Sequence, residues 1–203
     1  MMVSEKIEKI IKTEKCLQDH NDNLNIDTIK TVEYGKYMQQ NNSKSKPLDW
    51  ILISKNDNSI VLLSKYILDC GKFNESQVHV ELRDSTLYRW LWNDFMDQAF
   101  SADEQEFIEE IACLSLKYIK DCFNIDKPLG NKCPVLKAYY TEYSKKKEKD
   151  GNIFSEFGAY WLADSAEDKL CAFFVDEEGY ISKNGGYVDF KFGIRPLIIL
   201  KLK

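Results

Sequence analysis

The sequence predicts an α+β domain in which a mixed or antiparallel sheet carries two or three helices. Two strand-like runs joined by a short polar loop lie within residues 49–64. The apolar period then changes to the helical one within residues 87–122. The last part of the chain returns to short strands separated by turns. Strands, then helices, then strands are typical of an α+β domain, because segregated helices can pack on one face of an antiparallel sheet.

The chain begins with a predicted amphipathic helix. Over residues 4–18, isoleucines and a leucine recur at helical spacing, and Ser4 is placed to accept backbone N–H bonds as an N-cap. The next segment, QDHNDNLN, is rich in residues that hydrogen-bond their own backbone in turns. We therefore expect an N-terminal helix and linker over residues 1–26 and a single domain over residues 27–203.

Three strands are predicted in the first half of that domain. Residues 49–54 and 59–64 form a hairpin in this interpretation, because the Asn and Asp of the loop KNDN tolerate left-handed conformations. The run at residues 29–38 alternates enough for another strand. A polar loop that ends in proline separates it from the hairpin.

Residues 87–95 predict a helix with one apolar side, which we expect to face the sheet. Its apolar residues fall at i, i+3, i+4 and i+8: Leu87, Trp90, Leu91 and Phe95.

A longer helix is predicted from Ser101 to Cys122. Ser101 stands three residues before Glu104, the capping-box arrangement in which each side chain bonds the other's backbone N–H. The buried face of this helix would consist of Phe107, Ile108, Ile111, Leu114, Tyr118, Ile119 and Cys122.

The remaining elements are one weaker helix and several strands. The helical pattern at residues 136–143 runs into KKKEKDG, where lysines complement the helix dipole and Gly151 can supply the cap. Residues 170–175 and the pair YI predict a hairpin around the turn DEEG. Residues 187–194 and 197–203 predict the last strands.

Composition limits the functional class. The chain is 44% hydrophobic and 30% charged, with a formal charge of -5, as in an ordinary globular protein. The acidic balance disfavours nucleic acid as a partner, because phosphates repel such a surface. The first residues lack the apolar core of a signal peptide, and no later run approaches the about 20 apolar residues of a membrane span. We therefore expect a cytoplasmic protein with no membrane contact.

The six cysteines predict reduced thiols, without a metal or another cofactor. No two of them form a C-x-x-C pair, and no secretory context favours disulfides. They are Cys16, Cys70, Cys113, Cys122, Cys133 and Cys171.

Seven short segments, read in order, resemble a family of uncharacterised bacterial and phage-associated domains. They are VEYGKY, PLDWILI, IVLLSKYILDC, LYRWLWNDFMDQAFSADEQEFI, YWLADS, VDEEGYI and FGIRPLIIL. The family pattern runs G-x-Y, P-I-x-W-x-V-L, L-L-S-x-x-x-L-D, L-R-x-W-L-N-x-x-F-x-x-x-A-F, W-W-L-R-S, V-x-x-x-G and G-V-R-P. The resemblance extends over residues 30–203.

That family is similar to the C-type lectin-like fold, which formylglycine-generating enzymes and variable ligand-binding proteins of phages also use. The resemblance implies a mixed sheet with helices packed against it. It also implies that six residues define the fold: Trp50, Trp90, Trp161, Gly193, Arg195 and Pro196.

The chain departs from the family pattern at several polar positions. Ala163 and Asp164 stand where Arg and Ser are expected, and Tyr88 and Trp92 stand where Arg and Asn are expected. The family's aliphatic strand F-L-L-S is absent between residues 107 and 133, where our interpretation places the long helix. A polar site built from these positions would be altered here.

An acidic cluster after Trp161 is the main candidate for ligand binding. Asp164, Glu167 and Asp168 follow a strand at its junction with a loop, where a rigid scaffold can present contacts. The cluster could bind a cation or a basic partner, or it could consist of solvated loop acids. The lysines of KKKEKD could bind an anion, or they could form a solvated helix end.

Three catalytic or metal-binding alternatives have weaker support. The tripeptide WND at residues 92–94 matches the calcium-binding tripeptide of C-type lectins, but it lies in a predicted helix without an E-P-N or Q-P-D partner. Copper chemistry of the formylglycine type would need Cys133 and Cys171 close together as thiolates. A nucleophilic triad would have only His20 and His79 as bases.

The sequence therefore predicts a noncatalytic module that binds a protein or a small ligand, and a phage or mobile-element origin would fit this role. An enzyme derived from the formylglycine-generating type is one alternative. A carbohydrate-binding domain is the other.

Overall fold

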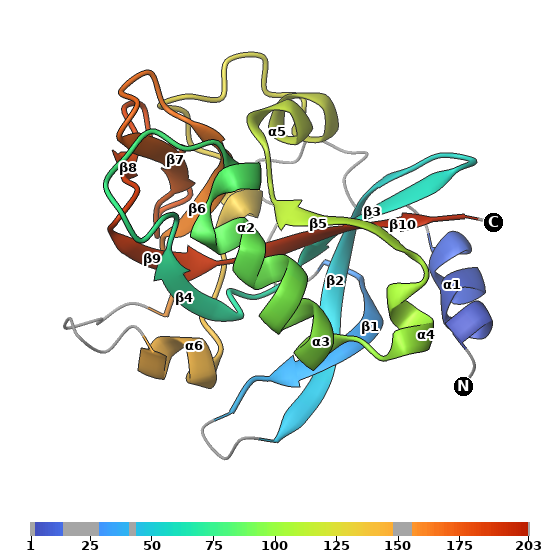
Figure 1. The fold of residues 1–203 in the computed structure, drawn as a ribbon. Coiled ribbons are helices and arrows are strands. Elements are labelled where there is room, and N and C mark those ends of the chain that lie inside the picture. Colours follow the sequence, from blue (N-terminus) through green and yellow to red (C-terminus); the bar gives the residue numbers. More distant parts are fainter. Residues whose placement is uncertain (1–2, 14–28, 41–43, 148–155, 203) are drawn as a thin grey trace.

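The computed structural model describes residues 3–13, 29–40, 44–147 and 156–202, which form an α+β fold with two five-stranded sheets (Figure 1). The predicted α+β class is therefore confirmed. The first sheet has the strand order β1-β2-β3-β10-β5, and all its neighbouring strands are antiparallel. Its strands are β1 (Thr31–Met38), β2 (Ser45–Lys55), β3 (Ser59–Ser64), β5 (Ile108–Cys113) and β10 (Pro196–Lys201).

The second sheet has the order β4-β9-β6-β7-β8 and is mixed, since β6 and β9 run parallel. Its other neighbouring strands are antiparallel. The strands are β4 (Asp69–Lys72), β6 (Tyr160–Ser165), β7 (Cys171–Val175), β8 (Gly186–Tyr187) and β9 (Lys191–Ile194).

The helices of the described residues are short. They are α1 (Val3–Ile11), α2 (Thr86–Trp90), a π-helical turn (Leu91–Phe95), α3 (Met96–Ala99), α4 (Ala102–Gln105), α5 (Leu116–Phe123) and α6 (Glu142–Lys147), with 3₁₀ turns at Leu82–Asp84 and Pro134–Leu136. None of the helices in this described part of the chain is long and apolar enough to cross a membrane.

The first sheet is buried on both faces. On one face, Leu52 and Leu62 share a core cluster with helix residues such as Phe95. On the other, Ile51 and its neighbours form a second cluster with Ile119 of α5. A sheet covered on both sides needs apolar residues at consecutive positions, which explains the unbroken runs WILI and IVLL. Helices therefore pack on both faces, whereas the sequence pattern had indicated one.

The predicted hairpin is formed by β2 and β3, which pair antiparallel. The side-chain oxygen of Asn56 accepts hydrogen bonds from the backbone N–H groups of Asn58 and Ser59, each at 2.8 Å. The Asn56 side chain thus accepts from backbone N–H groups that have no strand partner in the turn, which is a common role of asparagine.

The predicted helix at residues 87–95 is also present, as α2 and the π-helical turn that continues into α3 (Figure 1). Leu87, Leu91 and Phe95 are buried against the first sheet, whereas Trp90 is only partly buried. The Trp90 ring lies with its centroid 5.6 Å from that of Phe95.

The predicted long helix from Ser101 to Cys122 is wrong. The capping box at Ser101 is present, but it begins only the four residues of α4, and the chain then forms β5. A register shift in the pairing of β5 with β10 sets Ile108 opposite Leu200 and Ile111 opposite Ile198. The extra residue in β5 therefore turns Ile108 and Ile111, three positions apart, to the same face. This bulge imitates the i, i+3 spacing of a helix.

Two other predicted helices are shorter than expected. The weak pattern at residues 136–143 becomes a helix only from Glu142, because Tyr139 and Tyr140 make β-bridges with Phe157 and Ile67. The N-terminal helix ends at Ile11. Gly151 and residues 14–18 of these predictions lie outside the described residues.

The helix α1 packs on the first sheet. Ile7 and Ile10 are buried in the core cluster that includes Val32 of β1. Lys6 forms an ion pair with Glu104 at 2.6 Å, and Lys55 Nζ donates to the carbonyl oxygen of Ile11 at 2.7 Å.

Two of the tryptophans expected to define the fold lie at the centre of the molecule. Trp50 and Trp161 are fully buried, and each indole N–H donates to a backbone carbonyl: Trp50 to Tyr34 at 2.7 Å and Trp161 to Gly71 at 3.0 Å. Each indole N–H therefore ties its strand to another strand of the same sheet, β2 to β1 and β6 to β4, and is not left unpaired.

The G-I-R-P segment joins the two sheets. Gly193 pairs with β4, and an added Cβ there would meet Ile67 Cγ2 at 2.6 Å. Arg195 is fully buried and donates from Nε to the carbonyl oxygen of Ser64 at 2.8 Å and from Nη1 to the hydroxyl of Tyr160 at 3.0 Å. Pro196 then begins β10, where the chain crosses to the first sheet.

Candidate functional site

A cavity of about 730 Å³ lies at the end of the second sheet, between the loop of the β6–β7 hairpin and the segment around β8. Glu167 and Asp168 come from the hairpin loop, Cys171 and Phe173 come from β7, and Leu129 lies in the chain after α5. The remaining wall is the continuous segment at residues 183–187 together with Phe190. Its volume falls within the about 300–1,000 Å³ of pockets that bind small ligands.

Backbone hydrogen bonds hold the hairpin loop in place. The side-chain carboxylate of Asp168 accepts a hydrogen bond from Leu170 N at 3.0 Å. The backbone carbonyl oxygen of Asp168 accepts one from Cys171 N at 2.9 Å. Gly185 has a φ of +77° and approaches so closely that a Cβ would meet the carbonyl oxygen of Ala172 at 2.8 Å. Only glycine allows residues 183–187 to approach β7 this closely.

The segment at residues 183–190 is anchored by one buried residue and presents two aromatic rings. Val188 is buried and donates its N–H to Leu170, while its carbonyl oxygen accepts from Asn74 N at 2.8 Å. Tyr187 and Phe190 flank it with exposures of 42% and 50%. Their ring centroids are 5.4 Å apart, nearly perpendicular. The segment thus exposes large apolar side chains from a fixed backbone.

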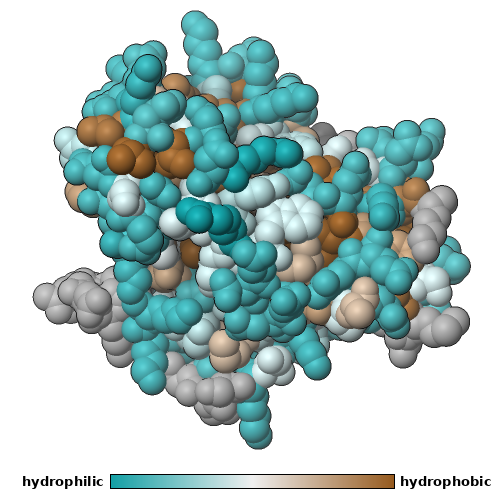
Figure 2. Space-filling model, in the orientation of Figure 1, coloured by the Kyte–Doolittle hydropathy of each residue, from teal (hydrophilic) through white to brown (hydrophobic). Residues whose placement is uncertain are grey.

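Exposed apolar side chains concentrate at this end of the molecule. Leu129, Tyr187 and Phe190 line the cavity. Leu170 is exposed on the hairpin loop, and its carbonyl oxygen accepts the N–H of Val188. Figure 2 shows hydrophobic residues at the surface over β7 and β8. An exposed apolar cluster around a cavity, rimmed by charges, is typical of an interaction site.

Two of the three predicted acidic residues lie at the cavity. Glu167 and Asp168 line it, but Asp164 does not. Asp164 accepts the N–H of Leu116 at 2.7 Å, at the first residue of α5. Burial raises the pKa of Asp164, the Leu116 N–H lowers it, and the Glu81 carboxylate raises it further. Asp164 therefore stabilises the start of a helix.

The described residues contain no group of three or more His, Cys, Asp or Glu side chains that could hold a metal ion. The WND tripeptide lies in the π-helical turn, as expected from its helical context. Burial raises the pKa of Cys133 to about 11, and it raises that of Cys171 with help from Asp168. Both thiols are therefore protonated near neutral pH.

The histidine and lysine candidates from the sequence do not lie at the cavity; their contacts are with other parts of the fold. His79 is exposed, with Nδ1 3.2 Å from the carbonyl oxygen of Lys169, and His20 lies outside the described residues. Lys147 of the KKKEKD run forms an ion pair at 2.9 Å with Asp69, which is buried. This lysine fixes α6 to the second sheet.

The sequence interpretation missed the aromatic pair. Residues 187–194 were expected to form one strand, but they divide into β8 and β9 around a turn that contains Asp189 and Phe190. The alternation of the predicted strand at residues 187–194 already indicated that Tyr187 is exposed. If the apolar Val188 points inward, its neighbour Tyr187 points outward.

Comparison with protein-family models, curated proteins and solved structures finds no significant match to this chain. The family resemblance of the sequence motifs therefore stays a prediction. The class of protein defined by the geometry is an α+β domain with an exposed aromatic and acidic cavity.

Proposed function

We propose that the chain is a noncatalytic binding module with a C-type lectin-like fold, acting in the cytoplasm, and that it binds a protein segment at the cavity beside β8. The observation that carries this proposal is the pair Tyr187 and Phe190, exposed on an anchored segment around the cavity. Tyrosine and phenylalanine are enriched at protein interfaces, since their rings bury a large area at a small cost in conformational entropy.

The chemistry of the walls favours a partner segment with an apolar and a basic residue. An apolar side chain of the partner would enter between Leu129 and Phe173, which line the cavity. A lysine or arginine would lie beside Glu167 and Asp168 on the hairpin loop, since these two carboxylates outnumber the single cation of the lining, Lys183. The net charge of -5 would favour the approach of a basic partner over an acidic one.

A carbohydrate is the second candidate, for one specific reason. The exposed rings of Tyr187 and Phe190 offer stacking faces, and Asp168 and Asn184 at the same cavity can hydrogen-bond hydroxyl groups. The motif resemblance to the lectin-like fold supports both candidates equally.

A paired array experiment tests the proposal. Labelled protein is applied to a peptide array, rich in sequences that combine basic and large apolar residues, and to a glycan array. The double variant Tyr187→Ala/Phe190→Ala is compared with the wild type, and Ile11→Ala serves as control because Ile11 is also exposed but belongs to α1.

We expect peptide binding that the double variant weakens by about 30-fold or more, as for loss of an interface hot spot of about 2 kcal/mol. The control should bind like the wild type. Glycan binding that depends on the two rings would establish the carbohydrate candidate instead. Binding that the double variant leaves intact would refute the cavity as the site.

A further inference from the structure

β1 is an edge strand of the first sheet, and its neighbours determine where its backbone groups point. Lys65 N donates to the carbonyl oxygen of Asp49 at 2.9 Å, so the N–H and C=O of Asp49 point away from β1. These groups alternate in direction along a strand, so those of the next residue, Trp50, point towards β1. Trp50 pairs there with Val32. Val32 is therefore hydrogen-bonded to β2 through its backbone.

The backbone groups of Thr31 and Glu33, on either side of Val32, point to the open edge for the same reason. Within the described ranges, their N–H and C=O groups have no hydrogen-bond partner. Further along β1, the N–H of Gly35 donates to the carboxylate of Glu104 at 3.4 Å, so that part of the edge is occupied. The first part of β1 thus offers a short row of free donors and acceptors, which an added strand can use.

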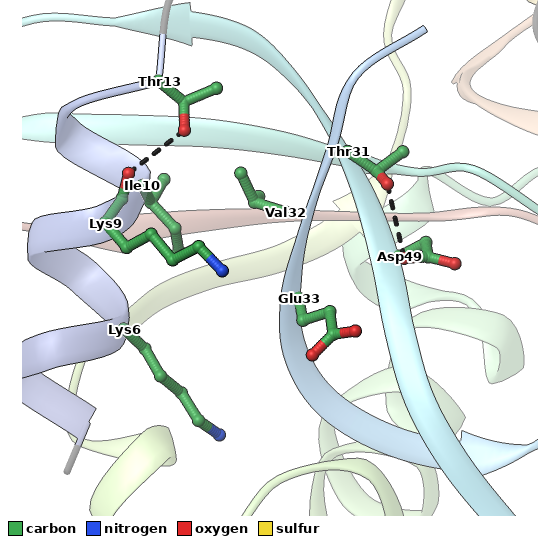
Figure 3. Close-up of a pocket in the computed structure, with 8 residues that line it drawn as sticks. All are labelled: Lys6, Lys9, Ile10, Thr13, Thr31, Val32, Glu33 and Asp49. Atoms are coloured by element: carbon green, nitrogen blue, oxygen red, sulfur yellow. Dashed lines mark hydrogen bonds between the residues drawn. The ribbon is translucent and has the colours of Figure 1, made fainter. Parts of the chain in front are cut away.

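The two faces of β1 differ in charge beside this open edge. Figure 3 shows Val32 in the gap between β1 and α1, where Lys9 and Ile10 form the other wall. Glu33 and its direct partner on β2, Asp49, point to the opposite face. Among the residues that the structure describes, Lys9, Glu33 and Asp49 have no ion-pair partner. A strand beside β1 would therefore meet a positive charge on one face and negative charges on the other.

We propose that a partner protein adds a short extended segment to this edge, antiparallel to β1 like the other neighbours in the first sheet. The partner residue opposite Val32 lies on the face of Val32, so its side chain enters the cavity of about 220 Å³ between α1 and β1. An acidic side chain there pairs with Lys9, and its methylene groups contact Ile10. The partner residue opposite Glu33 lies on the other face, where a lysine or arginine pairs with Glu33.

The antiparallel direction fixes the order of these two charges in the partner. An antiparallel segment passes Glu33 before it passes Val32, so its sequence contains a basic residue followed directly by an acidic one. Main-chain hydrogen bonds supply affinity in this mode of recognition, and the alternating side chains set the register. The site belongs to the first sheet and is independent of the proposed partner surface at β8.

Fluorescence anisotropy with the purified full chain tests the main-chain part of this proposal. The probe is a labelled eight-residue peptide of threonine and valine with the pair Lys-Glu at its centre. The lysine, opposite Glu33, exchanges hydrogen bonds with the edge, whereas the N–H of the glutamate, opposite Val32, points to solvent. An N-methyl group on the peptide lysine should therefore weaken binding at least tenfold, and one on the glutamate should change it little.

Charge reversal tests the side-chain part. A peptide with Lys-Lys in place of Lys-Glu should bind the wild type at least tenfold more weakly, and Lys9→Glu should restore its binding. Lys12→Glu is the control, because Lys12 directly follows α1 but does not line the cavity, and it should restore nothing. Circular dichroism checks that both variants fold, and the N-methyl comparison needs only the wild type.

Four results would overturn the proposal: no binding of the Lys-Glu peptide, equal effects of the two N-methyl groups, equal binding of the Lys-Lys peptide, or no rescue by a folded Lys9→Glu variant. Analytical ultracentrifugation covers a further occupant. Self-association of the chain that Glu33→Lys abolishes would make a second copy, and not a partner protein, the strand at this edge.

Discussion

Replacing Glu104 with glutamine removes one charge from a buried site while keeping the shape of the side chain. The carboxylate of Glu104 accepts hydrogen bonds from Lys6 Nζ at 2.6 Å, from Ser101 N at 3.0 Å, from Ser101 Oγ at 2.9 Å and from Gly35 N at 3.4 Å. It therefore joins α1, the start of α4 and Gly35 of β1, which lies where the pairing of β1 with β2 shifts register. A glutamine offers only one acceptor oxygen, so its NH₂ group must face one set of these donors.

The expected cost follows from those contacts. Losing two charge-assisted hydrogen bonds removes about 3 kcal/mol, at about 1.5 kcal/mol each. Lys6 is a quarter exposed and can turn to water, which recovers part of that amount. We therefore expect Glu104→Gln to lower the free energy of unfolding by about 2 kcal/mol. For a chain of this size, the melting temperature should fall by about 4–8 °C.

The loss should also depend on pH. Burial alone raises the pKa of Glu104, but the hydrogen bonds from Lys6 and Ser101 outweigh it, so the pKa lies below its ordinary value. The stabilisation from the carboxylate is therefore present above the ordinary glutamate pKa and is lost as the pH falls through the lowered pKa. The difference between wild type and variant should shrink in acid.

Urea unfolding followed by tryptophan fluorescence, at pH 7 and at about pH 3, measures both effects. Glu106→Gln is the matched control, since Glu106 is exposed next to the same helix, and it should change stability little. A Glu104→Gln variant as stable as the wild type at pH 7, or one whose deficit persists unchanged in acid, would refute the assigned role of this carboxylate.

Three further changes test the frame around the site. Gly193→Ala should cost about 1–3 kcal/mol in urea unfolding because its Cβ has no room, whereas Gly71→Ala, whose nearest atom would lie at 3.2 Å, should cost less; equal losses would contradict the packing. Lys147→Met should cost about 2 kcal/mol, since it removes the cation beside the buried Asp69 carboxylate and leaves only the hydrogen bonds from Tyr37 and Cys70; a neutral result by calorimetry would contradict the ion pair. Asp164→Asn should gain stability relative to the wild type as the pH rises above about 4. The reason is that the raised pKa of Asp164 makes its ionised form unfavourable in the folded state. Unfolding curves with the same pH dependence in both proteins would contradict this.

Local patterns in the sequence predicted the elements in which the spacing of apolar and turn residues fits only one kind of structure. The β2–β3 hairpin and the helix from Thr86 were found because turn residues and an i, i+3, i+4 pattern mark each one. Strand β5 was missed because its bulge sets Ile108 and Ile111 on one face at helical spacing. Pairing with β10, which comes almost ninety residues later, determines that bulge, so no local pattern reveals it.

The candidate site was predicted in part for a similar reason. Glu167 and Asp168 follow a strand, and a loop after a strand is commonly exposed, so their position was readable. Asp164 differs because a contact with α5, distant in sequence, converts it into a helix-capping group. Tyr187 and Phe190 gain their significance only from the turn that exposes both rings beside the hairpin loop.

The most direct test of the proposed binding surface is an NMR titration of the isotope-labelled chain with the strongest peptide from the array. Shifts of backbone amides should concentrate in residues 167–173 and 183–190, the two segments that contain most of the residues lining the cavity. The Tyr187→Ala/Phe190→Ala variant should lose them. Shifts that concentrate instead at α1 or along the first sheet, and that persist in this variant, would contradict the account.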